Sequence, residues 1–228
     1  MKNILFLFSA ICCLSCLSCG KQSSHKIKPE QGGIDIITNI YFNASKDLDD
    51  RKSIIVSKLN YKRDTLIEIV PDIDYPEFID KLFIISDTLA YDISDTDPKQ
   101  FLFSILKKTP AIQVQRKESG AVFSKQPLEY FDKRKEMKDT ILFKKAYKRF
   151  YINTPEQLST FYVHPTDTLL PYSFYQKEGE IYGGRIERID FYDKKNDRFV
   201  SIQLFPRPNW DSEAKNIFEF NEFAKKRK

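Results

Sequence analysis

All four cysteines of this chain lie within its first nineteen residues, as Cys12, Cys13, Cys16 and Cys19. Cysteine supplies a reactive thiolate, and pairs of cysteines form disulfides or bind metal ions. The 209 residues that follow Cys19 therefore offer no thiol nucleophile, no disulfide and no cysteine-type metal site.

Histidine is almost as scarce, since the sequence holds only His25 and His164. A metal site with two or three histidine ligands is therefore excluded after His25. His164 precedes Pro165 and lies near Asp167 in the sequence, so a carboxylate could orient it as a general base. A lone histidine beside a proline is more typical of a loop or packing residue, and we expect no catalytic role for it.

Two acidic stretches, 72–80 and 92–97, could supply oxygen ligands or an acid–base pair for glycoside cleavage. The first stretch is flanked by prolines, which is typical of an exposed turn. The second lacks the central glycine and the twelfth-position glutamate of an EF-hand. Neither the dinucleotide fingerprint nor the P-loop pattern is present. We therefore expect no catalytic residue, no metal and no cofactor.

The first nineteen residues have the organisation of an export signal. Lys2 supplies a positive start, the stretch 4–14 is predominantly apolar, and Ser18-Cys19-Gly20 closes it. The apolar stretch is too short to span a bilayer. The segment resembles a bacterial lipoprotein signal peptide, in which the cysteine after the cleavage site is lipidated. Such signals usually carry a leucine three positions before the lipidated cysteine, and here Cys16 holds that position. The residues before Cys16 resemble those before Cys19, so the pattern alone does not choose between the two cysteines.

That resemblance implies lipidation of Cys19, with Cys16 as the alternative, and attachment to a bilayer through N-terminal acyl chains. It implies a cell-envelope location, and Gly20 in place of aspartate favours the outer membrane, with the periplasmic or surface face left open. We expect a signal peptide at 1–18, a flexible tether at 19–33, and one domain at 34–228, with two small subdomains as the alternative.

An apolar fraction of 41% and an aromatic fraction of 14% predict a packed core. The net charge of +5 is unevenly distributed along the sequence, which contains one acidic and one basic block. Residues 64–97 hold ten acidic residues and one basic residue, whereas residues 99–149 hold fourteen basic and five acidic residues. We expect the blocks to face each other or to be solvated, with docking of a charged partner as the alternative. The export signal argues against nucleic acid as that partner.

The pattern of the chain predicts an α+β fold, mainly an antiparallel sheet with a few helices. Asp97-Pro98 predicts a helix near 98–108, and Trp210-Asp211-Ser212 predicts a C-terminal helix over 213–225. Thr154-Pro155-Glu156 predicts a further helix to about residue 162. The clearest strand signal is a hairpin, and a long strand is a further candidate. The two arms of the hairpin are expected at 186–192 and 198–205, and the long strand at 140–152.

The long strand would place aromatic and basic side chains on one face. These are Phe143, Lys145, Tyr147, Arg149 and Tyr151. Tyrosine and arginine are enriched at the centres of protein interfaces, so the last four are candidates for binding a partner. The alternative is a sheet face that packs against a helix while its cations reach water.

These observations favour a non-enzymatic, lipid-anchored envelope protein that binds another macromolecule, as an assembly factor or as an immunity protein that blocks a toxin. An envelope hydrolase acting on cell-wall or polysaccharide material is a second hypothesis. A carrier of an apolar ligand is a third, and it requires a lined cavity inside the sheet.

Overall fold

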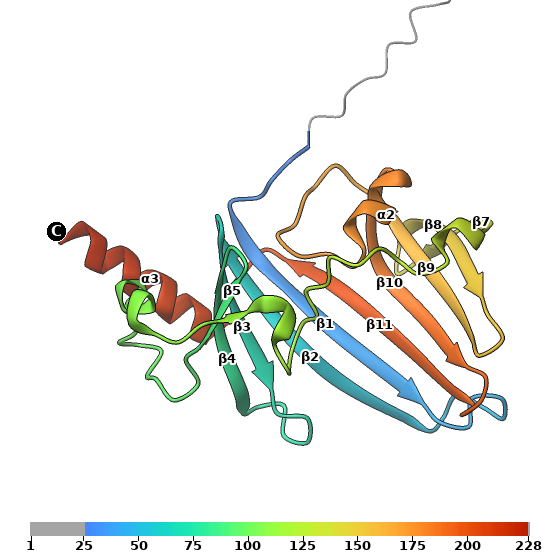
Figure 1. Ribbon diagram of the computed structural model, residues 1–228, viewed down its shortest axis with the longest axis horizontal. Coiled ribbons are helices and arrows are strands. Elements are labelled where there is room, and N and C mark those ends of the chain that lie inside the picture. The colour runs from blue at the N-terminus through green and yellow to red at the C-terminus, as the bar shows by residue number, and fades with distance from the viewer. Residues whose placement is uncertain (1–25, 228) are drawn as a thin grey trace, which may run out of the picture.

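The computed structural model describes residues 26–227, and they form one eleven-stranded antiparallel sheet (Figure 1). The order across the sheet is β6-β5-β4-β3-β2-β1-β11-β10-β9-β8-β7. The strands are β1 (Gln31–Tyr41), β2 (Arg51–Lys62), β3 (Thr65–Pro71), β4 (Ile79–Ser86), β5 (Leu89–Asp92), β6 (Ile112–Gln113), β7 (Lys135–Leu142), β8 (Lys145–Asn153), β9 (Gln157–Pro165), β10 (Gly184–Asp193) and β11 (Arg198–Arg207). The helices are α2 (Gln176–Ile181), α3 (Ser212–Lys226) and three short 3₁₀ helices at Phe103–Lys108, Val114–Arg116 and Phe131–Lys133. Mainly antiparallel sheet and a C-terminal helix are both confirmed.

The first strand lies in the middle of the sheet. β1 pairs with β2 on one side and with β11, the last strand of the chain, on the other. Pairing the ends of the chain in this way makes the sheet continuous from β6 to β7. Ile27 also forms a backbone bridge with Thr168, so the chain contacts the β9–α2 connection before it enters β1.

Side chains alternate between two faces of the sheet, as the pleat requires. We call the face that carries Ile36, Leu59 and Phe150 the inner face, and the face that carries Ile67 and Tyr147 the outer face. On the outer face, Ala214, Ile217 and Phe218 of α3 pack on β3 and β4. The inner face is crossed by two irregular segments, 114–131 and 166–183 (Figure 1).

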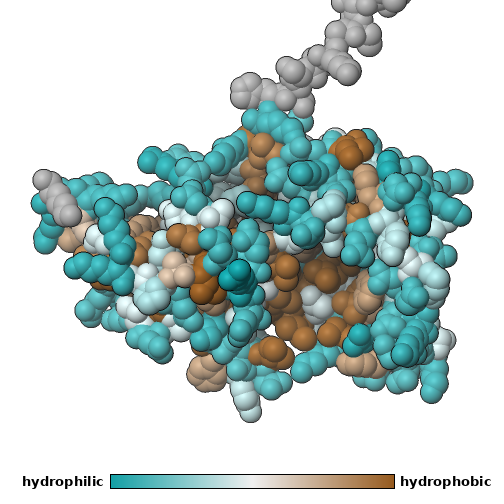
Figure 2. Space-filling model, viewed as in Figure 1, coloured by the Kyte–Doolittle hydropathy of each residue, from teal (hydrophilic) through white to brown (hydrophobic). Residues whose placement is uncertain are grey.

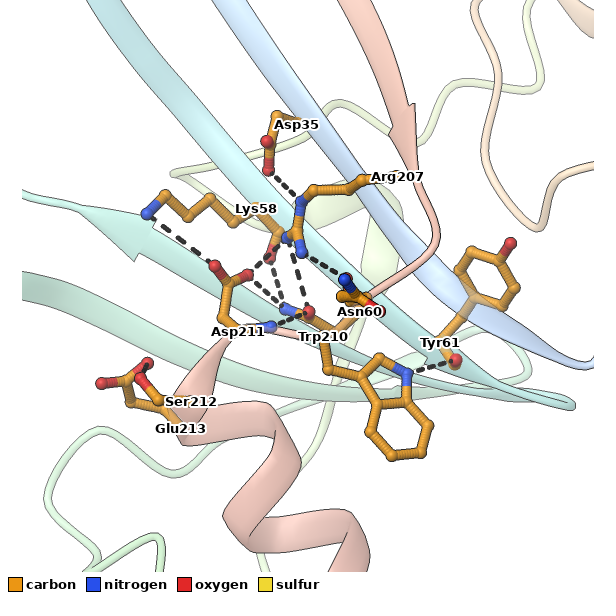
Figure 3. A network of polar contacts seen from close by, with 10 residues as sticks. Asp35, Lys58, Asn60, Tyr61, Arg207, Trp210, Asp211, Ser212 and Glu213 are labelled. Atoms are coloured by element: carbon orange, nitrogen blue, oxygen red, sulfur yellow. Dashed lines mark hydrogen bonds and ion pairs between the residues drawn. The ribbon is translucent and has the colours of Figure 1, made fainter.

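A polar network anchors the start of α3 to the sheet (Figure 3). The buried Asn60 side chain accepts a hydrogen bond from the backbone N–H of Asp211 at 2.8 Å and donates one to the Asp211 carboxylate at 3.0 Å. Arg207 donates to Asp35 at 2.8 Å and also pairs with Asp211. Trp210 donates its indole N–H to the Tyr61 carbonyl at 3.0 Å. Because each group is paired, the network can be buried without a large desolvation cost.

Three expected elements differ in the structure. The expected helix near 98–108 is reduced to a 3₁₀ helix at Phe103–Lys108. Asp97 does cap a turn by accepting from the Lys99 N–H, but the backbone of Phe101 and Phe103 bonds to the Asn221 side chain of α3 instead of continuing a helix. Tertiary hydrogen bonds therefore replace the helical ones.

The helix expected after Thr154 is wrong, because Gln157–Pro165 forms strand β9. Thr154 accepts a hydrogen bond from the Gln157 N–H, so the capping signal makes a turn and the chain then pairs with β8 and β10. The single strand expected over 140–152 is also wrong. It is split into β7 and β8 by a turn at Phe143-Lys144.

Candidate functional site

An apolar hollow of about 300 Å³ lies on the inner face. Its floor is formed by Ile36, Val56, Ile189 and Ile202, which come from four different strands. Its walls come from the two crossing segments. They include Val122, Tyr172 and Phe174. Figure 2 shows brown apolar atoms in a hollow over β1 and β11, with hydrophilic atoms around the rim. The sheet and the crossing segments together therefore leave apolar surface in an open recess.

A buried ion pair fixes the first crossing segment over the inner face. Lys117 lies 2.8 Å from Oε2 of Glu68, and their side chains are 1% and 0% exposed. Ser57 and the Ala121 N–H donate to the other Glu68 oxygen. Gly120 permits this approach: its φ is +79°, and a Cβ there would lie 2.3 Å from Glu68. The pair joins the acidic and basic charge blocks and sets the position of Val122 at the hollow.

The second crossing segment contributes two aromatic walls. The rings of Tyr172 and Phe174 lie 5.9 Å apart, edge to face, and Tyr172 also contacts Phe123 of the first segment. The Tyr172 hydroxyl donates to the Val122 carbonyl at 3.3 Å, which ties the two segments together. Burial, together with the charge of Glu68, raises the pKa of Tyr172 well above its usual range. The phenol is therefore neutral and adds no charge to the hollow.

A second recess of about 410 Å³ lies beside the hollow and shares Ser124 and Tyr175 with it. We call it the tyrosine annex. Its polar and aromatic lining includes Gln126, Glu129, Tyr130, Gln157, Ser159 and Tyr175. Burial raises the pKa of Tyr175, and the carboxylates of Glu178 and Glu129 raise it further. The annex thus combines these polar and aromatic groups with apolar side chains, those of Pro127, Leu128, Ile152 and Phe161.

The four residues expected to bind a partner lie on the outer face of β8. Lys145 and Tyr147 both reach Glu187, the ammonium at 3.3 Å and the phenol hydroxyl at 3.1 Å, and Arg185 donates to the second Glu187 oxygen at 2.6 Å. Tyr147 is only 7% exposed. Its burial raises the pKa of its phenol, and the negative charge of Glu187 raises that pKa further.

The other two of these residues, Arg149 and Tyr151, are half-buried. Arg149 donates to the Lys138 carbonyl of β7 at 2.9 Å. Phe143, expected on the same face, lies instead in the β7–β8 turn and is 74% exposed. A role of this face in binding a partner stays a prediction.

The other sequence candidates lie away from both recesses. His164 is on the outer face, where its Nδ1 contacts the Ala146 carbonyl at 3.2 Å. In the stretch 72–80, Asp72 accepts backbone hydrogen bonds from Asp74 and Tyr75 in the β3–β4 connection. In the stretch 92–97, Asp92 bonds to Ser94 and pairs with Lys81.

The part of the chain that the structure describes contains no group of three or more histidine, cysteine or acidic side chains placed to hold a metal. Within the same residues, none of the helices combines the length and apolar content needed to cross a membrane. The predicted lipidation sites, Cys19 and Cys16, lie outside the described residues.

Sequence reasoning missed both recesses. The alternation of Val200, Ile202 and Leu204 predicts their buried face. It does not say that Ile202 borders an open recess while Leu204 is covered. Likewise, no local pattern marks Tyr130 or Tyr175, because they line one recess only when the crossing segments fold onto the sheet.

No family model matches this sequence, and neither does any curated protein. Among solved structures, the chain is similar to a domain described as an outer membrane lipoprotein-sorting protein from Vibrio parahaemolyticus. Their sequences are 11% identical, the match covers 86% of this chain and 92% of that one, and the TM-score is 0.28. It is also similar to a DUF1329 family protein from Desulfovibrio piger, at 9% identity, 79% and 86% coverage, and a TM-score of 0.21. TM-scores this low establish neither a common fold nor a common function.

Proposed function

We propose that this protein is a lipid-anchored, non-enzymatic protein of the bacterial cell envelope that binds the acyl chain of an amphiphilic ligand. The observation that carries the proposal is the apolar hollow on the inner face of the sheet. A carrier of an apolar ligand requires a lined cavity, and the hollow is a recess of this kind. The predicted signal peptide supports the proposed location, since an exported, lipidated domain would lie beside the envelope lipids.

The hollow has the size and chemistry of a binding site for an apolar chain. Its volume of about 300 Å³ falls at the lower end of the range of small-molecule sites. Ile36, Ile189 and Ile202 provide a floor without titratable groups, whereas hydrolysis would require a nucleophile or an acid–base pair at the bound ligand. The chemistry of the lining therefore favours binding over cleavage.

A protein partner fits the same role. A carried amphiphile must be received from one component and passed to another, which is the kind of contact that an accessory factor makes. The partner face expected on β8 lies on the outer face, away from the hollow, so ligand and partner would not compete for the same surface.

Saturated fatty acids of increasing length test the proposal. Each methylene buried in the hollow should contribute about 0.8 kcal/mol, which tightens Kd roughly fourfold. We expect affinity to rise in this way with chain length and then to level off once the hollow is full. Displacement of a fluorescent fatty-acid analogue measures each Kd, on protein that carries Cys19→Ser so that no acyl chain of its own competes.

Replacing Ile202 by Asp should abolish this binding, because the variant places a charge in the floor of the hollow. Ile105, which is 45% exposed in the 3₁₀ helix at Phe103–Lys108, provides the matched control as Ile105→Asp. Circular dichroism establishes that both variants are folded. An affinity that is independent of chain length, or equal loss in both variants, would contradict the proposal.

A further inference from the structure

Two tyrosines of the annex have unusual backbone conformations. Tyr130 has φ 56° and Tyr175 has φ 40°, both in the left-handed region. Bulky side chains are disfavoured there, and such strain is retained mainly where the surrounding structure or a bound ligand requires it.

The remaining non-glycine residues with positive φ in the described part of the chain have a local explanation. They are Asn43, Arg63, Asp87, Phe143, Lys144 and Asp197, and they lie in connections between consecutive antiparallel strands. Hairpin connections often require positive φ. Tyr130 and Tyr175 lie outside such connections, in the two crossing segments, and both line the annex. Tyr130 is the third residue of a turn closed by a 3.3 Å hydrogen bond from the Phe131 N–H to the Leu128 carbonyl, and Tyr175 directly precedes α2, so these two local bends place both rings at the same recess.

The polar groups of the annex suit hydroxyls better than a negative charge. Gln126 and Gln157 offer amides, Ser159 a hydroxyl, and Glu129 a carboxylate. None of the described residues that line the annex carries a positive charge. The Lys133 ammonium, which is not part of the lining, lies 5.0 Å from the centre of the Tyr130 ring. A phosphate would meet Glu129 without a lining cation to compensate it.

Aromatic rings beside amides and a carboxylate form a surface that matches a sugar. A sugar ring presents apolar C–H groups to an aromatic face, and its hydroxyls donate to and accept from amides and carboxylates. Tyr130 is 50% exposed and Tyr175 is 37% exposed, so both rings retain accessible surface. The Gln157 amide already lies 3.3 Å from the Ser159 hydroxyl, which groups two of these polar side chains on β9.

The annex adjoins the apolar hollow, so one ligand could occupy both recesses. Ser124 and Tyr175 belong to the walls of both. We propose that the tyrosine annex binds the uncharged saccharide headgroup of an amphiphile whose acyl chain occupies the apolar hollow, with Tyr130 and Tyr175 contacting the sugar. This inference rests on the proposed function and specifies the class of its ligand as a glycolipid.

Two amphiphiles with the same alkyl chain test the headgroup separately from the chain. Dodecyl maltoside and dodecyl phosphate compete with a fluorescent fatty-acid analogue for the Cys19→Ser protein, below their micelle concentrations. We expect the maltoside to bind at least about tenfold more tightly, because the annex hydrogen-bonds hydroxyls and repels a phosphate. Equal affinities, or tighter binding of the phosphate, would overturn the inference and leave the acyl-chain proposal intact. Failure of both to bind would overturn both.

Tyr130→Asn separates a ligand-binding role from a structural one. Asparagine adopts the left-handed conformation more readily than tyrosine, so the melting temperature should not fall. Affinity for the maltoside should fall about tenfold, while affinity for the phosphate stays unchanged. Tyr75→Asn is the matched control, since Tyr75 is 62% exposed in the β3–β4 connection and should change neither affinity. Equal loss of both ligands in Tyr130→Asn, or a lower melting temperature with unchanged affinities, would contradict a headgroup site.

Discussion

Glu68 and Lys117 are a buried pair of opposite charges that come from the two charge blocks of the sequence. The Glu68 carboxylate also accepts hydrogen bonds from Ser57 and the Ala121 backbone, and the Lys117 ammonium donates to the carbonyls of Ser119 and Ala121. The ammonium lies 5.0 Å from the centre of the Phe83 ring. With nearly all polar atoms paired in this way, two buried charges can be retained in the core.

Removing one member of this pair should be costly. Lys117→Met leaves the Glu68 charge buried without its partner, and we expect a loss of about 3–5 kcal/mol in the free energy of unfolding. Urea unfolding followed by circular dichroism measures the loss. The exposed Lys125 of the same crossing segment is the control, and Lys125→Met should change stability by less than about 0.5 kcal/mol. The double variant Glu68→Gln with Lys117→Met should recover part of the lost stability, because the buried charge of Glu68 is then removed as well. Equal losses of stability in Lys117→Met and Lys125→Met would show that the buried pair has no special role.

At the scale of elements, the two-residue turn between β7 and β8 is formed by Phe143 and Lys144, which are unfavourable residue types for such a turn. Phe143 has φ 51° and Lys144 has φ 65°, the pattern of a type I′ turn, for which Asn-Gly is preferred. Glycine is scarce in this chain, with seven residues, and side chains therefore occupy positive-φ positions elsewhere. The hairpin forms because pairing of β8 with both β7 and β9 offsets the local strain.

Relieving this strain should stabilise the protein. The double substitution Phe143→Asn with Lys144→Gly supplies the preferred turn and should raise the free energy of unfolding by about 1 kcal/mol. Thermal unfolding measures the change as a higher Tm. Lys144→Ala, which shortens the side chain but keeps the unfavourable conformation, should leave Tm unchanged. A lower Tm for the double variant would show that Phe143 is stabilised by contacts that offset its strain.

Several elements could be predicted from the sequence, and the misses have identifiable causes. The hairpin of β10 and β11 and the helix α3 follow from strong alternation and a clear helix start. The Phe143-Lys144 turn carries no glycine, asparagine or proline to mark it. At Thr154 the local signal predicts the start of a helix, but the Thr154 side chain caps a turn instead, and pairing with β8 and β10 makes the following segment strand β9.

At the scale of the whole molecule, the predicted anchor and the observed sheet are joined by a short segment. Cys19 precedes Lys26, the first described residue, by seven positions. A chain of that length spans at most about 25 Å when fully extended. Lipidation at Cys19 would therefore hold the β9–α2 end of the sheet, which Ile27 contacts, close to the membrane surface.

Substitution of the two candidate cysteines tests the anchor. Cys19→Ala should release the protein from the membrane fraction into the soluble fraction of the envelope, because the buried acyl chains that hold it are lost. Cys16→Ala should leave attachment unchanged. Immunoblots of fractionated cells and mass spectrometry of the mature N-terminus check both results. The reverse pattern would assign lipidation to Cys16, and an unmodified terminus downstream of Cys19 would exclude an acyl anchor.

By itself the sequence determined that the chain is mainly antiparallel sheet with a C-terminal helix, because both depend on local periodicity and capping. It also confined cysteine chemistry to the first nineteen residues, because that depends on composition alone. Only the tertiary structure decided that the inner face is left partly open, that Glu68 pairs with Lys117, and that Tyr130 and Tyr175 line the same recess. The two residues of each of these pairs are 45–49 positions apart in the sequence. They come together because the crossing segments fold back over the sheet, which depends on long-range packing and leaves no local pattern.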